Sequence, residues 1–181
     1  MKTRTASIVA AVVVAALGLA ACAPPAPTPD PNAPDHVVEV SPGATPDAIE
    51  VSPGDTIEVV GTGFTTTGNL GARPPLAGQP AGVYVTFGRF GDPWKPSEGA
   101  SSSARQIIEQ NWALPTPSYN ALGGIAGLVE MDGDGGFTVR LTATEASGTN
   151  PQYGIGIYPG SGSVNAAEEI LVPVEFAGGA A

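Results

Sequence analysis

The chain holds few residue combinations that carry out catalysis. Its one histidine, His36, is far in sequence from any serine in a Gly-x-Ser-x-Gly elbow, and Gly160-Ser161-Gly162-Ser163 lacks that form. This serine stretch is better explained as a turn between two strands. Without a histidine base, an enzyme would need paired carboxylates. We therefore expect no enzyme, and a secreted hydrolase that uses carboxylates is the alternative.

A second chemical pattern is the acidic loop Asp132-Gly133-Asp134-Gly135-Gly136. Alternating carboxylates at Asp132 and Asp134 suit calcium, which prefers hard oxygen ligands. The EF-hand pattern also requires a glutamate at loop position 12, where this chain has Ala143. Asp and Gly residues directly before Phe137 are also what a tight hairpin needs, and we favour the hairpin. No metal and no cofactor are predicted.

The third pattern is a set of aromatic and basic side chains that would suit a ligand. Tyrosinate is a possible haem ligand, and exposed rings stack on sugars or small molecules. The alternative is that Trp94 and Trp112 pack a helix of a long insertion back onto the sheet, which the low aromatic content (6%) favours. The predicted ligand-binding residues are Tyr84, Arg89, Trp94, Lys95, Arg105, Trp112 and Tyr158.

The only cysteine, Cys22, follows a segment with the parts of an export signal. Lys2 and Arg4 form a basic start, an apolar run covers residues 8–16, and small residues precede the thiol. Leu19-Ala20-Ala21-Cys22 resembles a lipobox, where diacylglycerol is attached to the thiol and the chain is cleaved just before it. We predict a lipoprotein signal peptide over 1–21 and lipidation of Cys22, which places the protein on the extracytoplasmic face of the cell membrane. An ordinary secretory signal is the alternative.

Charge and cysteine content exclude several functions. The formal net charge is -10, and it becomes -12 when Lys2 and Arg4 leave with the signal. Such an acidic protein is a poor match for nucleic acid or for anionic lipid head groups, so the predicted membrane contact is the lipid on Cys22. Once Cys22 carries lipid, no thiol remains for a disulfide, for thiolate catalysis or for a cysteine metal site.

These residues must be positioned by one domain on a stalk. Residues 22–35 are rich in proline and predict an extended tether, and residues 36–181 have the length of a single domain. Short runs with period-two alternation, separated by Gly and Pro, predict an all-β, immunoglobulin-like sandwich of about seven strands. Glu39–Gly43 and Glu50–Gly54 are near-copies and predict two similar strand-and-turn units.

One segment has helical spacing instead. Residues 101–112 begin with three serines, which suit an N-cap, and place apolar residues at 104, 107, 108 and 112. We predict a helix of about three turns there, ended by Pro115, within a long insertion at about 91–124. Long connections on a rigid scaffold are where binding surfaces tend to be built.

Three sequence patterns together resemble strands of Ig-like domains in secreted actinobacterial proteins: Val-Val-Gly-Thr-Gly-Phe at 59–64, Gly-Val-Tyr-Val-Thr-Phe-Gly at 82–88 and Asp-Gly-Gly-Phe-Thr-Val-Arg-Leu at 134–141. The layout also resembles the neocarzinostatin-like apoproteins, which are sandwiches that hold a small ligand in a cleft. Segments 94–97, 112–115 and 158–162 are similar to surface domains found beside HtaA-type haem-uptake modules in corynebacteria. The resemblance implies an Ig-like fold and, in the second and third cases, ligand or haem binding.

The residues and the resemblance lead to one expected function. We expect a lipid-anchored surface module with a non-catalytic binding or envelope-structural role, toward an unknown surface partner or small ligand. A small-ligand carrier, with haem as the first candidate, is the alternative from another class.

Overall fold

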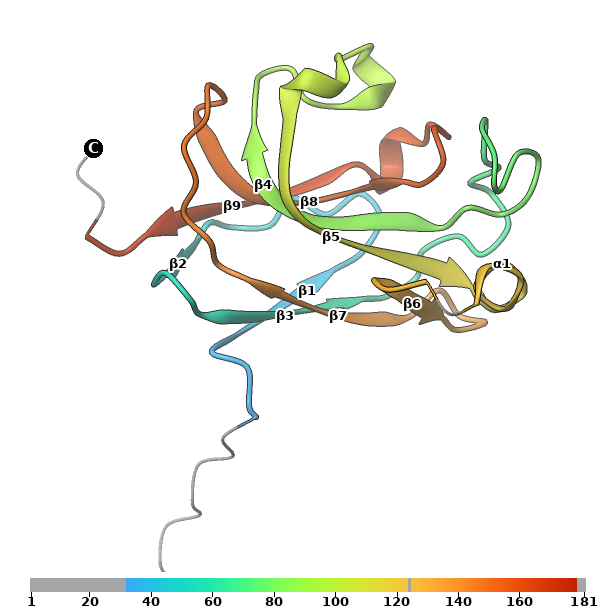
Figure 1. The fold of residues 1–181 in the computed structure, drawn as a ribbon, viewed down its shortest axis with the longest axis horizontal. Helices are drawn as coiled ribbons and strands as arrows, with labels where there is room; N and C mark the ends of the chain where they lie inside the picture. The colour runs from blue at the N-terminus through green and yellow to red at the C-terminus, as the bar shows by residue number, and fades with distance from the viewer. Residues whose placement is uncertain (1–31, 124, 179–181) are drawn as a thin grey trace, which may run out of the picture. The chain divides into compact units, whose positions relative to one another are not determined.

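The computed structural model describes residues 32–123 and 125–178, and the chain divides into two units, Met1–Pro31 and Asn32–Ala181. The predicted signal peptide, Cys22 and the tether as far as residue 31 lie outside the described residues. The second unit is mostly β, with two sheets and one α-helix (Figure 1).

The smaller sheet has three strands in the order β1-β3-β7, and β3 is its central strand. β1 (His36–Val40) runs parallel to β3 (Thr56–Gly61), whereas β7 (Phe137–Thr142) runs antiparallel to it. The inward residues of β3 and β7, among them Ile57, Val59 and Leu141, are buried, and they alternate with outward residues that are polar except for Val60. This confirms the period-two alternation that the sequence predicts for these two strands.

The larger sheet has six strands in the order β2-β9-β8-β4-β5-β6 and curls strongly (Figure 1). Its strands are β2 (Ile49–Val51), β4 (Val83–Phe90), β5 (Arg105–Pro115), β6 (Leu128–Met131), β8 (Gln152–Pro159) and β9 (Ile170–Phe176). β2 pairs with β9, and β6 with β5, in parallel, and the other pairs are antiparallel. One hydrophobic core lies between the two sheets, with residues from both.

The two near-copies of Glu-Val-Ser-Pro-Gly form two similar strand-and-turn units, as predicted. The amide of Ala44 donates to the Ser41 carbonyl over 3.0 Å, and the amide of Asp55 donates to the Ser52 carbonyl over 3.1 Å. Gly43 and Gly54 have φ angles of 77° and 95°. Proline followed by a glycine with positive φ is the arrangement of a type II turn. The preceding strands, β1 and β2, lie in different sheets.

The predicted helix over residues 101–112 is wrong. Ser101 caps a single 3-10 turn, η2 (Ser102–Ala104), and β5 follows at once. Because neighbouring residues of a strand point to opposite faces, Ile107 packs beside Phe90 and Ile108 against the main core. A strand with apolar contacts on both faces thus produced a spacing typical of a helix.

The residues predicted as one insertion at 91–124 therefore divide into three parts. Residues 91–104 connect β4 to β5 and contain η1 (Pro96–Glu98) and η2, and β5 itself belongs to the sheet. The helix that does form is α1 (Thr116–Leu122), which begins just after Pro115, where the predicted helix was expected to end. Within the described ranges, no helix is long and apolar enough to span a bilayer.

The strand directions give the domain two distinct ends. At one end, which we call the N-terminal end, lie Asp35, the turn 52–55 and the loop 143–151. At the other, which we call the distal end, lie the loops 62–82, 132–136 and 160–169, together with the start of α1. The loop 160–169 contains the last short helix, η3 (Ala166–Glu168).

Candidate functional site

Five of the seven predicted ligand residues meet on the outer face of the six-stranded sheet. Tyr84 pairs across the strands with Trp112 on one side and Tyr158 on the other, at ring-centroid distances of 5.0 and 5.6 Å. The Trp94 ring contacts the edge of Tyr158 at 6.5 Å, and the guanidinium of Arg105 lies 5.3 Å from the same tyrosine ring. The sequence therefore located a real aromatic cluster.

The polar atoms of this cluster are engaged within the fold. The indole Nε1 of Trp112 donates to the Ala81 carbonyl over 2.6 Å, and Arg105 Nη1 donates to the Trp94 carbonyl over 2.5 Å. Burial raises the pKa of the Tyr158 hydroxyl, although the nearby Arg105 charge opposes the shift. These contacts favour the packing alternative, except that the rings hold the segment 91–104 and not a three-turn helix onto the sheet. Ligand binding by the cluster stays a prediction.

The other two predicted residues lie apart from the cluster. Arg89 points to the opposite face of β4, where its guanidinium lies 4.6 Å from the centre of the Tyr153 ring. Its Nε donates to the Asn150 carbonyl over 2.6 Å, which holds the loop 143–151 in place. Lys95 follows Trp94 on the loop, and its carbonyl accepts from the amides of Glu98 and Ala100 over 3.1 and 3.2 Å.

The acidic loop after β6 forms a tight turn, but the favoured hairpin is wrong, because β6 and β7 belong to different sheets. Asp132 Oδ1 accepts from the amides of Asp134 and Gly136 over 2.9 and 2.8 Å. The Asp132 amide in turn donates to the Gly136 carbonyl over 2.9 Å. Among the described residues, no three His, Cys, Asp or Glu side chains are grouped so that they would hold a metal ion.

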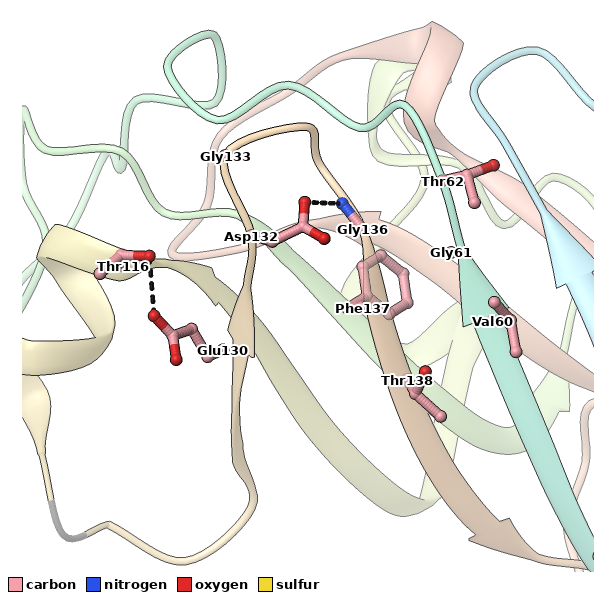
Figure 2. Close-up of a pocket in the computed structure, with 10 residues that line it drawn as sticks. All are labelled: Val60, Gly61, Thr62, Thr116, Glu130, Asp132, Gly133, Gly136, Phe137 and Thr138. Atoms are coloured by element: carbon pink, nitrogen blue, oxygen red, sulfur yellow. Dashed lines mark hydrogen bonds between the residues drawn. The ribbon is translucent and has the colours of Figure 1, made fainter.

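This loop forms the centre of a cleft that the sequence did not reveal. A groove of about 600 Å³ lies beside it, with the Phe137 ring packed over Gly61 and the side chains of Glu130 and Asp132 at its edge (Figure 2). Thr116 Oγ1 donates to Glu130 Oε1 over 2.8 Å. The groove is lined by Val60, Gly61, Thr62, Thr116, Glu130, Asp132, Gly133, Gly136, Phe137 and Thr138.

A smaller and more apolar pocket of about 250 Å³ adjoins the groove. Pro80, Pro115 and Pro117 line it together with Thr66 and Thr67. Groove and pocket share Thr116, Asp132 and Gly133, so we treat them as the polar and apolar compartments of one distal cleft. Its lining comes from five separate segments, and in the sequence only the Asp132 loop stood out.

Two buried carboxylates hold the loops of the distal end in place. Glu168, 2% exposed, accepts from the Thr65 amide over 2.7 Å and from Asn69 Nδ2 over 2.5 Å. Glu169, 4% exposed, accepts from the Ser97 amide over 3.0 Å and from its hydroxyl. Since Thr66 and Thr67 follow Thr65 directly, Glu168 fixes one wall of the apolar compartment.

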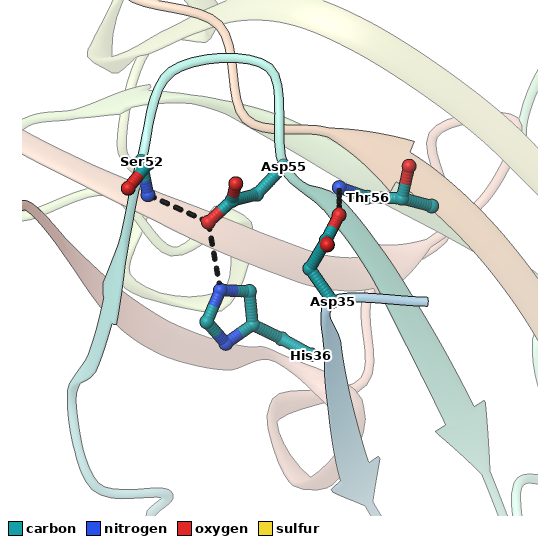
Figure 3. Close-up of polar contacts among 5 residues, drawn as sticks. All are labelled: Asp35, His36, Ser52, Asp55 and Thr56. Carbon is teal, nitrogen blue, oxygen red and sulfur yellow. Dashed lines mark hydrogen bonds and ion pairs between the residues drawn. The ribbon is translucent and has the colours of Figure 1, made fainter. Parts of the chain in front are cut away.

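The N-terminal end carries a different set of polar contacts (Figure 3). The Thr56 amide donates to Asp35 Oδ2 over 2.7 Å, which fixes the residue before β1 to β3. Asp55 Oδ2 accepts from the Ser52 amide over 2.7 Å and lies 2.9 Å from His36 Nε2. These two contacts, with the Ser52 amide the larger cause, lower the pKa of Asp55. They secure the strand through which the chain enters the domain.

Comparison with models of protein families, with curated proteins and with solved structures finds no match to this chain. The resemblance to secreted Ig-like domains, to HtaA-associated domains and to neocarzinostatin-like apoproteins therefore stays a prediction. The site must be interpreted from its own geometry.

Proposed function

We propose that the protein is a lipid-anchored, Ig-like binding module on the extracytoplasmic face of the membrane, and that its distal cleft binds a partner without catalysis. The observation that carries this proposal is the position of the cleft. It opens at the distal end, whereas Asp35 is held at the N-terminal end. A module tethered through its N-terminus would present such a cleft away from the membrane.

Strand order supports the Ig-like part of the proposal. β9, β8, β4 and β5 follow one another as strands G, F, C and C′ do in immunoglobulin domains, and β3 beside β7 corresponds to B beside E. In variable domains, the B–C, C′–C″ and F–G loops gather at one end and form the binding surface. Here the loop 62–82, the residues after β5 and the loop 160–169 are their counterparts. The parallel strands β1 and β6 are additions to this order.

Binding is favoured over catalysis by how the two carboxylates of the cleft lie. Figure 2 shows Glu130 pointing toward Thr116 and Asp132 toward Gly136, so the two side chains do not face a common point. Both residues are exposed. A pair of catalytic carboxylates needs convergence on the substrate, and the acid of the pair needs a partly desolvated setting.

The anchor is supported by the sequence. The thiol of Cys22 ends the apolar export segment, and residues 22–35 provide a proline-rich spacer. We expect Cys22→Ser to abolish incorporation of labelled fatty acid and to leave the far-ultraviolet circular dichroism of the domain unchanged. Fatty-acid labelling that persists in Cys22→Ser would refute the anchor.

The binding role is tested by photo-crosslinking on intact cells. Benzoylphenylalanine is placed at Gly133 in the cleft and, as the matched control, at Thr149 in the loop at the N-terminal end. We expect a discrete adduct from position 133 that position 149 does not give, because only the first lies in the cleft. Equal adducts from both positions, or none from position 133, would contradict the proposal.

A further inference from the structure

The proposed binding role leaves open what the distal cleft accepts. We infer that it takes an extended peptide segment of a partner protein, with a basic side chain in the polar compartment and an apolar side chain in the apolar compartment. This inference rests on the proposed function and specifies its ligand. It is carried by the charges, the composition and the spacing of the two compartments.

The polar compartment selects for positive charge. Glu130 and Asp132 contribute two carboxylates to it, and none of its lining residues is Lys, Arg or His. Glu130 Oε1 accepts one hydrogen bond from Thr116, so the carboxylate keeps acceptor capacity for a further donor. An ammonium or guanidinium group satisfies such acceptors by charge-assisted hydrogen bonds. The overall formal charge of -10 also attracts a positively charged segment, and it does so over a longer range than the two carboxylates.

An exposed apolar side chain lies next to the apolar compartment. Leu70 and Pro80 face each other in an isolated antiparallel β-bridge, so their side chains stand on the same side of the two segments. Leu70 is 54% exposed and does not line the compartment itself, but the bridge places its apolar side chain beside Pro80, which does. An aliphatic or aromatic side chain of the partner would bury apolar surface on both.

The connection between the compartments sets the spacing of the ligand. Both are lined by Thr116, Asp132 and Gly133, so they adjoin and are open to one chain segment. An extended peptide points residues i and i+2 to the same face, about 7 Å apart. We therefore expect the bound motif to be a basic residue and an apolar residue separated by one position.

A sugar is the strongest competing ligand, and the lining disfavours it. Saccharide sites commonly use exposed aromatic rings for stacking, and the one aromatic residue in the cleft, Phe137, is 5% exposed. The partly exposed rings of Tyr84 and Trp112 lie outside both compartments. A peptide with one charge and one apolar group matches the lining better.

The test is a selection from a phage-displayed library of random dodecapeptides on the full chain reconstituted in nanodiscs. The enriched peptides are then synthesised and their affinities measured by fluorescence anisotropy. We expect Lys or Arg two positions from Leu, Ile, Val or Phe. Glu130→Gln should weaken binding about two- to fivefold, as expected for an exposed ion pair, whereas the exposed Glu39→Gln on β1 should not.

A second variant blocks the cleft without touching its charge. A Cβ at Gly133 meets no atom within 4 Å, so Gly133→Tyr fits the fold while its ring fills the junction of the compartments. It should weaken binding more than about tenfold, with Thr149→Tyr as the control for bulk. Enriched peptides that lack the basic-and-apolar motif, or that bind Gly133→Tyr normally, would overturn the inference. If position 133 still gave its photo-adduct on cells, the binding role would stand; if it did not, both would fail.

Discussion

The buried Glu168 offers the sharpest test of how the distal end is built. Its carboxylate is 2% exposed and accepts from the Thr65 amide and from Asn69 Nδ2, two donors on the loop 62–82. Glu168→Ala leaves both donors without this acceptor. The loss of a partner costs about 1–3 kcal/mol for each buried donor, and Thr65 is only half-buried, so we expect the free energy of unfolding to fall by about 2–4 kcal/mol.

Two control variants separate the causes of that loss. Glu168→Gln keeps the shape and one acceptor oxygen but removes the charge, so it should cost about half as much. Glu175→Ala removes an exposed glutamate from β9 and should change the free energy of unfolding by less than about 0.5 kcal/mol. The Asn69→Ala variant combined with Glu168→Ala should cost less than the sum of the two single changes, because they share one hydrogen bond.

The assay is equilibrium unfolding in urea followed by tryptophan fluorescence, in a Cys22→Ser background that removes the lipid. The midpoint should move while the denaturant slope stays constant, because the same surface is exposed on unfolding. Hydrogen exchange at the Thr65 amide should accelerate in Glu168→Ala. A destabilisation below about 1 kcal/mol, or an unchanged exchange rate at Thr65, would refute the view that Glu168 holds this loop.

Three further predictions concern pH and calcium. The pKa of Asp55 is lowered in the folded state, so the contribution of its carboxylate to the free energy of unfolding is present above about pH 4 and is lost as the pH falls through the folded pKa. Asp55→Asn should remove this part of the acid dependence when unfolding is measured from about pH 7 to about pH 3. The pKa of Tyr158 is raised in the folded state, so the contribution of its neutral hydroxyl to the free energy of unfolding is present below about pH 10 and is lost as the pH rises further. Tyr158→Phe should therefore flatten the fall of the melting temperature at alkaline pH. The same fall in Tyr158→Phe would show that ionisation of Tyr158 does not cause it. Millimolar calcium should leave the melting temperature unchanged, because Asp132 Oδ1 already accepts two amides; a rise would indicate a metal site.

The sequence predicted the strands well where one face is buried and the other is solvated. In β7 the apolar Phe137, Val139 and Leu141 alternate with exposed polar residues, and the two Ser-Pro-Gly turns follow from residue chemistry alone. It failed at residues 101–112 because both faces of β5 meet apolar clusters, so that the adjacent Ile107 and Ile108 are both partly buried. Helical spacing and a strand buried on both faces look alike in a short segment.

The distal cleft was beyond sequence reasoning for a different reason. Thr62, Thr66, Thr116 and Gly133 are each unremarkable as residues, and they become a site only because β5 ends where β3 and β6 also end. The aromatic cluster was found because its members are rare in this chain. The rare aromatic residues drew the prediction toward side chains that pack, whereas the cleft is lined mainly by Thr, Gly and Pro, which are common in this chain.

The way charges are satisfied connects the stability of the domain to its proposed specificity. Arg89 and Arg105 donate to backbone carbonyls, and Glu168 and Glu169 accept from amide and hydroxyl groups, so these links stabilise loops without pairing opposite charges. Among the described residues, Arg140 pairs with Glu58 beside the Val60 and Thr138 edge of the cleft, and His36 contacts Asp55 at the N-terminal end; none of these four residues lines the cleft. A hydrogen bond from a neutral donor satisfies a carboxylate but does not cancel its charge. The negative potential of the acidic residues therefore persists around the distal end, and it favours the approach of cationic segments while opposing acidic ones.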